Sequence, residues 1–224
     1  MGKVVERVGA VAVGGTRSRE PRLRADASRN RERIVAAARE ALVEQGADIP
    51  LDEVARRAGV GNATLYRNFA DRRELVRTVT LSVLYRTAER AEAVLAEEAD
   101  VFDALCRFVH DAAEERVGAL CTLLTGAFDD GDPELDAARD HLAAAVDALV
   151  DRARSSGRLR PDVGVGDLMV ALSQLSRPLP GTGRCELDQF LHRHLQLFLD
   201  GLRAPARSVL TGSPATLEDL QKKS

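Results

Sequence analysis

Tryptophan is absent from this chain, and all aromatic residues together make up 4% of its 224 residues. Glycine and proline are also scarce, at 17 and 8 residues, while hydrophobic residues reach 45%. Alanine, leucine, arginine and glutamate are abundant instead. This balance favours an all-α protein, and the chain is long enough to bury a sizeable core.

Cysteine is equally rare. The three cysteines, Cys106, Cys121 and Cys185, lie far apart and form no C-x-x-C pair. A zinc ribbon or a disulfide framework needs numerous or closely spaced cysteines, so we expect neither. We interpret the three as buried, reduced thiols, with a redox switch as the alternative.

Long apolar runs and the common catalytic motifs are also missing. No run approaches the ~18 residues that cross a bilayer, and the opening VGAVAVGG is too short and glycine-rich for a signal-peptide core. The patterns Glu-x-x-His, G-x-S-x-G, H-E-x-x-H and the phosphate-binding loop do not occur. We therefore expect a cytoplasmic protein that does not contact membranes, is not an enzyme, and needs no metal or other cofactor.

Charge is distributed unevenly along the chain. Residues 1–77 contain 16 Lys and Arg against 11 Asp and Glu, whereas residues 78–224 contain 16 against 24. The net charge of −3 therefore combines a basic N-terminal third with an acidic remainder. Phosphate attracts the first and repels the second, so we expect the N-terminal third to meet nucleic acid.

The segment from Leu51 to Phe69 has the pattern of a helix-turn-helix. Its first half repeats apolar residues at 3.6-residue spacing, which predicts a short helix with one apolar face. Gly59 follows where that helix must end, because glycine adopts the left-handed conformation at no steric cost. Leu65 and Phe69, four residues apart, predict a second short helix on the same core. Its outer side carries compact polar groups, one cation and one phenol, which suits a helix that enters a major groove.

These residues resemble the DNA-binding motif of the TetR family of transcriptional regulators. The family pattern is an apolar-x-x-(Ile/Val)-Ala-x-x-Ala-Gly-Val stretch followed by Thr-(Leu/Ile)-Tyr-x-x-Phe. This chain has Val-Ala at 54–55, Ala-Gly-Val at 58–60 and Thr-Leu-Tyr-Arg-Asn-Phe at 64–69. The family often has serine where this chain has Gly61, and serine or threonine where it has Pro50. Both residues are acceptable at a helix start.

The resemblance places the second short helix in the major groove and implies roles for its exposed residues. The first three would meet base edges, since asparagine can pair with adenine and the methyl groups of alanine and threonine can contact thymine. The tyrosine would donate its hydroxyl to a phosphate. Arg67, on this helix, would read guanine or hold a phosphate, and Arg72 would hold a phosphate. The residues expected to contact DNA are Asn62, Ala63, Thr64, Tyr66, Arg67, Asn68 and Arg72.

Apolar periodicity predicts further helices downstream. Asp71, with Glu74 three residues later, has the pattern of a capping box that opens a helix reaching about Ala96. Gly164 and Gly166 precede another helix and suggest a flexible start for it. The remaining helices are predicted at 101–116, 119–128, 135–153, 165–175 and 187–202.

We divide the chain into four parts on this basis. A disordered basic arm occupies 1–28, and a three-helix helix-turn-helix DNA-binding domain occupies 29–77. A C-terminal helical bundle for ligand binding and dimerisation follows at 78–203, and a flexible tail at 204–224. The arm would contact the DNA backbone or minor groove, or would be a solvated leader without a role.

The family resemblance also implies that the last two helices of two copies form a four-helix dimer interface, and their apolar stripes fit this arrangement. A two-fold dimer requires a palindromic operator. The residues expected at the interface are Leu168, Leu172, Leu175, Leu187, Leu191, Leu195 and Phe198.

The sequence thus predicts a homodimeric repressor that a small organic effector releases from double-stranded operator DNA. His110 and His141 are candidates to line the effector cavity. A filled core without an effector would instead make the protein a structural DNA-binding module. An activator is the other alternative, because polarity depends on operator position.

Overall fold

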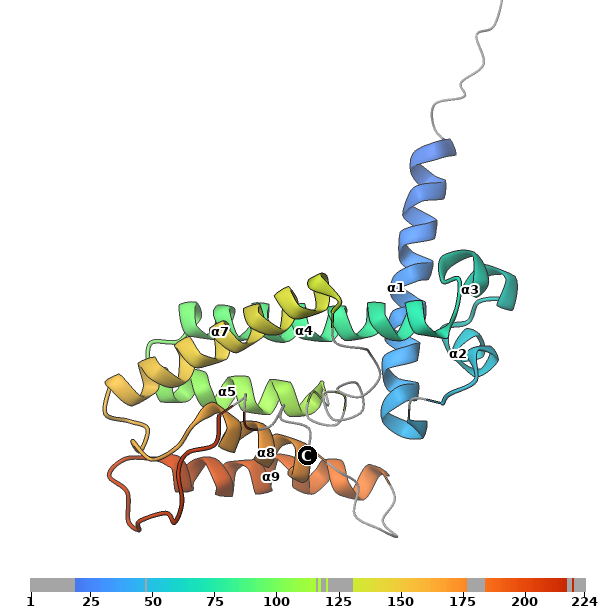
Figure 1. Ribbon diagram of the computed structural model, residues 1–224. Helices are drawn as coiled ribbons and strands as arrows, with labels where there is room; N and C mark the ends of the chain where they lie inside the picture. The colour runs from blue at the N-terminus through green and yellow to red at the C-terminus, as the bar shows by residue number, and fades with distance from the viewer. Residues whose placement is uncertain are drawn as a thin grey trace, which may run out of the picture.

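The protein consists of a small head and a larger helical body (Figure 1). Within the residues that the structure describes there is no β-strand, and Leu159 and Arg203 form an isolated bridge. The all-α prediction is therefore confirmed. The computed structural model describes residues 19–46, 48–115, 117, 120, 131–176, 184–216 and 219, with the backbone alone for 19–25 and 184–189.

The head contains α1 (Arg19–Gln45), α2 (Leu51–Ala58) and α3 (Asn62–Asn68). Helix α2 packs against α1, and α3 packs against α2. The first turns of α1 extend past α3, away from the body (Figure 1). Both short helices begin where the sequence predicted, after Pro50 and Gly61, and neither has a side-chain cap.

Residues 19–28 continue α1, although the sequence analysis assigned them to a disordered arm. The side chains at 26–29 are exposed, so this stretch has no apolar periodicity that would reveal a helix. Pro21 lies in the first turn, where backbone N–H groups have no helical acceptor, and therefore does not interrupt the helix. Residues 1–18 of the predicted arm lie outside the described residues.

Helix α4 (Arg72–Glu97) connects the head to the body. Its 26 residues span about 39 Å at 1.5 Å per residue. The predicted cap is confirmed, because the Asp71 side chain accepts a hydrogen bond from the Glu74 N–H at 2.8 Å. The Glu74 carboxylate in turn accepts from the Ala70 N–H at 2.7 Å. The start of the connecting helix is thus fixed at a defined residue.

The body is completed by α5 (Val101–Glu114), α7 (Pro133–Ser155), α8 (Val165–Leu175) and α9 (Arg184–Leu202). Helix α4 packs against both α5 and α7. Helix α5 lies between the α4–α7 pair on one side and the layer of α8 and α9 on the other (Figure 1). These helices agree with the predictions, whereas nearly all of the helix predicted at 119–128 lies outside the described residues.

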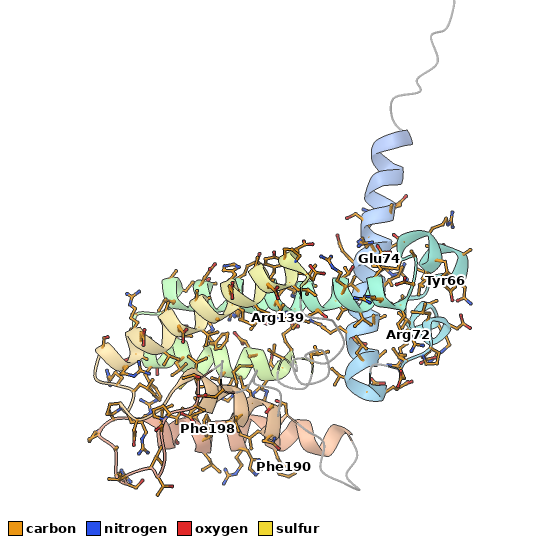
Figure 2. All side chains as sticks on the ribbon, viewed as in Figure 1. Tyr66, Arg72, Glu74, Arg139, Phe190 and Phe198 are labelled. Atoms are coloured by element: carbon orange, nitrogen blue, oxygen red, sulfur yellow. The ribbon has the colours of Figure 1, made fainter. Side chains whose placement is uncertain are left out.

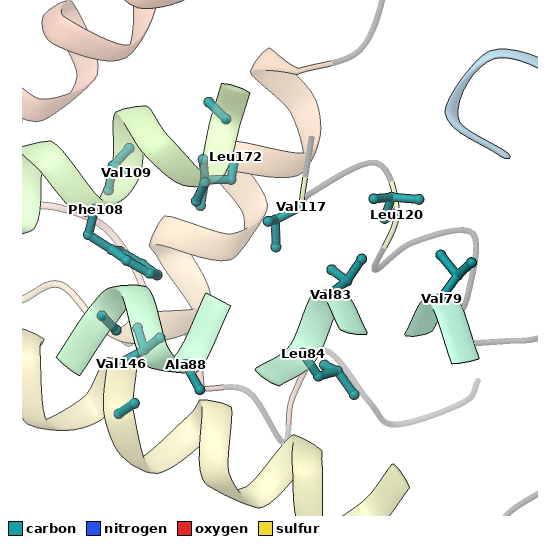
Figure 3. Close-up of a cluster of buried hydrophobic side chains, with 14 of the residues drawn as sticks. Val79, Val83, Leu84, Ala88, Phe108, Val109, Val117, Leu120, Val146 and Leu172 are labelled. Carbon is teal, nitrogen blue, oxygen red and sulfur yellow. The ribbon is translucent and has the colours of Figure 1, made fainter. Parts of the chain in front are cut away.

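One continuous core joins these layers (Figure 3). Its members come from all the described helices of the head and the body, and they are nearly inaccessible to solvent. Burial of this apolar surface is the main stabilising contribution to a bundle of this kind. The side chains that meet in Figure 3 include Val83, Leu84, Ala88, Phe108, Val109, Val146 and Leu172.

The C-terminal segment packs against the body as far as residue 216, although the sequence suggested a flexible tail from 204. The Ala215 carbonyl accepts a hydrogen bond from the Gly166 N–H at 2.9 Å. A Cβ at Gly164 or Gly166 would lie 2.5 Å from the Ala215 backbone, so glycine makes room for the segment instead of loosening the helix start. The buried Arg160 guanidinium also donates to the Ser208 carbonyl at 2.8 Å.

Candidate nucleic-acid interface and cavities

The turn between α2 and α3 depends on Gly59. This residue has φ 62° and ψ 37°, the left-handed conformation that the sequence predicted. The turn is closed by hydrogen bonds from the Gly59 N–H to the Arg56 carbonyl at 3.2 Å and from the Val60 N–H to the Ala55 carbonyl at 3.0 Å. The helix-turn-helix prediction is also supported by the buried side chains that hold the two helices together, Val54, Ala55, Ala58, Leu65 and Phe69.

Two arginines of α1 hold this unit in place, and the sequence analysis did not identify them. The Arg31 guanidinium lies 4.3 Å from the centre of the Phe69 ring and donates to the Asn68 carbonyl at 2.8 Å. The Arg33 guanidinium donates to the Gly59 carbonyl at 3.2 Å. Because their partners are 26 to 37 residues away, no local pattern in the sequence signals these contacts.

The residues predicted to contact DNA lie on the outer side of α3 and at the start of α4. Tyr66 is 52% exposed and lies at the edge of the head, whereas Leu65 beside it is fully buried (Figure 2). Asn62, Ala63 and Arg67 are also exposed. Helix α3 therefore presents one polar face to solvent and one apolar face to the head.

Several of these side chains have hydrogen-bond partners within the head. Asn62 Nδ2 donates to Asp52 Oδ1 at 2.9 Å, and Arg67 donates to the Ala63 carbonyl at 3.0 Å and the Thr64 hydroxyl at 3.1 Å. Asn68 Nδ2 donates to the Thr64 carbonyl at 2.8 Å, which turns its amide toward its own helix. Exposed polar groups of α3 are thus hydrogen-bonded within the head.

Arg72 is half-buried in the first turn of α4 and lies 3.5 Å from the exposed Asp48 carboxylate. Figure 2 shows Arg72 and Tyr66 in the head. The role of Arg72 in DNA contact stays a prediction.

Helix α2 is itself fixed by an ion-pair cluster. Glu53 accepts hydrogen bonds from Arg56 and from Arg57, each at 2.7 Å, and these bonds lower the pKa of its carboxyl to about 2. Arg57 also donates to Glu44 of α1 at 2.6 Å. Glu53 therefore stays ionised at neutral pH, and the pair of Arg57 with Glu44 ties α2 to α1.

This head and body match a known pair of domains. Residues 34–79 match the family model described as bacterial regulatory proteins of the tetR family, and residues 98–204 match the C-terminal domain of SbtR-like transcriptional regulators. The TetR transcriptional regulator SCO0520 from Streptomyces coelicolor is 30% identical, with a TM-score of 0.59, over 79% of this chain and 99% of that chain. The chain belongs to the TetR family.

Other TetR structures share its architecture. A TetR regulatory protein from Mycobacterium vanbaalenii is 31% identical with a TM-score of 0.56, over 81% of this chain and 99% of that chain. LfrR from Mycobacterium smegmatis, in complex with proflavine, is 23% identical with a TM-score of 0.55, over 75% of this chain and 95% of that chain. The second comparison concerns the fold alone. No curated protein matches the sequence.

The two histidines proposed for an effector cavity in this TetR protein are placed elsewhere. His110 Nδ1 lies 2.8 Å from His192 Nδ1, with the rings stacked, and His192 Nε2 lies 3.4 Å from Glu114. His141 Nε2 lies 2.8 Å from a Glu92 carboxylate oxygen. Neither histidine lines either of the two cavities described below. Each instead pairs with a polar group on a neighbouring helix.

Two cavities lie beside α4 in the described part of the TetR protein. The first, which we call the junction cavity, has a volume of about 260 Å³ and lies where α1, α4 and α5 meet. The second has a volume of about 420 Å³ and lies between α1 and α4. Arg39 of α1 and Arg86 of α4 line both, so the two cavities flank one pair of guanidinium groups.

The residues predicted at the dimer interface divide into two groups. The side chains at Leu175 and Phe198 are half-buried against the core, and that of Leu187 lies outside the described residues. Four others are 0–5% exposed within a single chain, so their side chains fill its own core and are not available to a partner. These four are Leu168, Leu172, Leu191 and Leu195.

Different apolar residues of α8 and α9 face outward. Val170 is 42% exposed, Phe190 47% and Leu197 60%, and Phe190 lies at the outer edge of this layer (Figure 2). The stripes predicted from the sequence are thus the inner faces of these helices. We call the set of Val170, Phe190 and Leu197 the outer α8–α9 face.

Other expectations concern cysteine, metal and membrane. Burial raises the pKa of the Cys106 thiol to about 11, which keeps it protonated and unreactive at neutral pH. The side chains of Cys121 and Cys185 lie outside the described residues. Within the part that the structure describes, no cluster of three or more His, Cys, Asp or Glu is arranged to hold a metal. None of the helices found there is both long and apolar enough to cross a membrane.

Proposed function

We propose that this TetR family regulator is a homodimeric repressor that binds a palindromic operator and is released by a small organic effector. The observation that carries the proposal is the outer face of α3, where Tyr66, Asn62 and Arg67 are exposed above a fully buried Leu65. An apolar inner face fixes the helix in the head, while the polar outer face is free to enter a major groove. The base-reading roles of Asn62, Ala63 and Thr64 and the phosphate role of Tyr66 belong to this proposal.

The outer α8–α9 face supports a dimer. Exposed Phe190 and Leu197 are more costly in water than in a protein interface, since each buried apolar Å² contributes about 25 cal/mol. A second copy that covers the same face would generate a two-fold axis and hold two heads at a fixed separation. Such a pair fits two half-sites about one turn of DNA apart.

Release by an effector requires coupling between the body and the head. Helix α4 contacts α1 in the head and both α5 and α7 in the body. Arg77 of α4 donates to Asp132 at 2.5 and 3.0 Å and to Glu134 at 2.7 Å, which ties the head end of the helix to the start of α7. A ligand that prefers one orientation of α4 would shift the head population by its differential affinity.

The cavities beside α4 support an effector. Their volumes of about 260 and 420 Å³ approach or reach the ~300–1,000 Å³ usual for small-molecule sites. LfrR, which has the same fold, is in complex with proflavine. The cavity space beside α4 favours a ligand-responsive regulator over a purely structural module.

The test is a selection of genomic DNA fragments by the purified protein, followed by anisotropy titrations of the enriched sequence at several salt concentrations. We expect a palindromic consensus and an affinity that falls linearly in a log–log plot against salt. In vitro transcription with the operator over the promoter should then decrease on addition of protein. Absence of an enriched sequence would overturn operator binding, and increased transcription would identify an activator.

A further inference from the structure

The junction cavity combines an apolar wall with a rim of charged side chains. Val83 of α4 and Phe108 and Ala112 of α5 form part of the wall, and all three are buried. Arg39 of α1 and Arg86 and Arg90 of α4 lie around the same space. Because Arg39 belongs to the head and Arg90 is beside the body core, the rim joins both parts of the molecule.

Two carboxylates face these three guanidinium groups. Glu115, at the end of α5, accepts hydrogen bonds from Arg39 and, at 3.0 Å, from Arg86. Asp111, one turn earlier, accepts from Arg90. One carboxylate therefore serves two guanidinium groups, one on each side of the junction between head and body.

The donors in this cluster outnumber the acceptors. Each guanidinium has five N–H groups, whereas a carboxylate offers two oxygens. A third acidic residue at the rim, Glu114, extends toward His192, with 3.4 Å between its carboxylate and Nε2. An incoming anion would find N–H donors in the fork geometry that suits carboxylates and related groups.

We propose that the junction cavity binds an organic anion, namely a carboxylate or sulfonate joined to a hydrophobic group. The hydrophobic group packs on Val83 and Phe108, and the anionic group replaces Glu115 on Arg39 and Arg86. A ligand too long for this space extends past the two arginines into the second cavity, which they also line. Binding releases the bridge from α1 to α5 and frees the head. This last step rests on the proposed function.

The binding test uses a matched pair of fluorescent probes. The first is 8-anilino-1-naphthalenesulfonate, and the second is 1-anilinonaphthalene, which lacks the sulfonate and is neutral. In fluorescence titrations of the full chain we expect at least about tenfold tighter binding of the sulfonate, as one charge-assisted interaction provides. Equal affinities for the two probes would overturn the proposal.

Two substitutions should change this preference in opposite directions. Arg86→Gln removes a guanidinium and should reduce the preference for the sulfonate about tenfold. Glu115→Gln removes the competing carboxylate and should raise it. A partly unfolded variant would bind both probes better, so their affinity ratio separates a specific gain from misfolding. The proposal would be contradicted if Arg86→Gln left the preference for the sulfonate probe unchanged. It would also be contradicted if Glu115→Gln lowered that preference.

Arg139→Gln is the matched control. Arg139 is on α7, pairs with Asp136 at 2.8 Å, and lies outside both cavities (Figure 2). Its substitution should leave the probe ratio unchanged, and a decrease equal to that of Arg86→Gln would show a general charge effect and refute the site.

A separate titration tests release from the operator. The sulfonate probe should weaken operator binding by the wild-type protein and have a smaller effect on Arg86→Gln. If the protein binds no DNA, the proposed function fails, but the probe ratio still tests the cavity. If the protein binds the operator but binds the sulfonate probe no more tightly than the neutral probe, the cavity inference alone fails.

Discussion

Gly59 offers a direct test of how the helix-turn-helix is held together. At φ 62° an L-residue with a side chain costs roughly 1–2 kcal/mol, because its Cβ approaches the following carbonyl oxygen. A Cβ here would also lie 2.6 Å from an Arg33 guanidinium nitrogen and would displace the bond from Arg33 to the Gly59 carbonyl. Loss of one partly solvated hydrogen bond adds at most about 1 kcal/mol. We therefore expect Gly59→Ala to destabilise the head by about 2 kcal/mol.

Gly61 is the matched control two residues away. Its φ of −74° and ψ of 151° suit any residue, and a Cβ there meets nothing within 4 Å. Alanine would not add a side-chain cap, and it would reduce the entropy of the unfolded chain, so the net change should stay within about 0.5 kcal/mol. Gly59→Asn should fall between the two alanine variants, because asparagine tolerates the left-handed conformation.

The assay is thermal unfolding of the three variants followed by circular dichroism. For a chain of this size, 2 kcal/mol corresponds to a decrease of about 4–8 °C in Tm. Hydrogen exchange of the α2 and α3 amides should accelerate in Gly59→Ala and remain unchanged in Gly61→Ala. Equal Tm values for the two alanine variants would refute the argument from backbone conformation.

Three other predictions follow from named contacts. Tyr66→Phe should weaken operator binding similarly on all sequences, without changing the slope of log affinity against log salt concentration. Arg72→Gln should lower that slope by about 1 in anisotropy titrations. An effect of Tyr66→Phe confined to one base pair would contradict its phosphate role. Leu197→Glu should yield monomers by light scattering, while the exposed-leucine control Leu210→Glu should remain dimeric, and a dimeric Leu197→Glu would place the interface elsewhere. Arg77 lowers the pKa of Asp132 from 3.8 to about 2, so this pair stabilises the fold above pH 3.8 and the contribution is lost as the pH falls through about 2. Asp132→Asn keeps the cap of α7, and its deficit in unfolding free energy should therefore be constant above pH 4 and shrink toward pH 2; a deficit independent of pH would argue against the ion pair.

Local patterns were sufficient for much of the fold. The turn at Gly59 and the cap at Asp71 depend on residues close together in sequence, so their chemistry could be recognised there. The apolar stripes of α8 and α9 were recognised as well, but their burial partner was misassigned. Periodicity identifies an apolar face without stating whether the same chain or a second copy covers it.

Contacts between distant residues could not be predicted in this way. His110 meets His192 across 82 positions, and Arg39 meets Glu115 across 76. The extension of α1 was missed for another reason, since the exposed side chains at 26–29 give no apolar periodicity. The exposed side chains of α3 were predictable because they are the residues left over once the buried ones are assigned.

The docking of the C-terminal segment on Gly164 and Gly166 redefines where the folded unit ends. Truncation at residue 204, where the family match stops, would remove the Ala215 carbonyl that accepts from Gly166 and the Ser208 carbonyl that accepts from Arg160. The truncated protein would expose the surface at the start of α8 that the Ala215 backbone covers in the full chain. A purification tag or fluorescent fusion therefore belongs beyond residue 216, and a side chain at either glycine would act like the truncation by preventing the segment from docking.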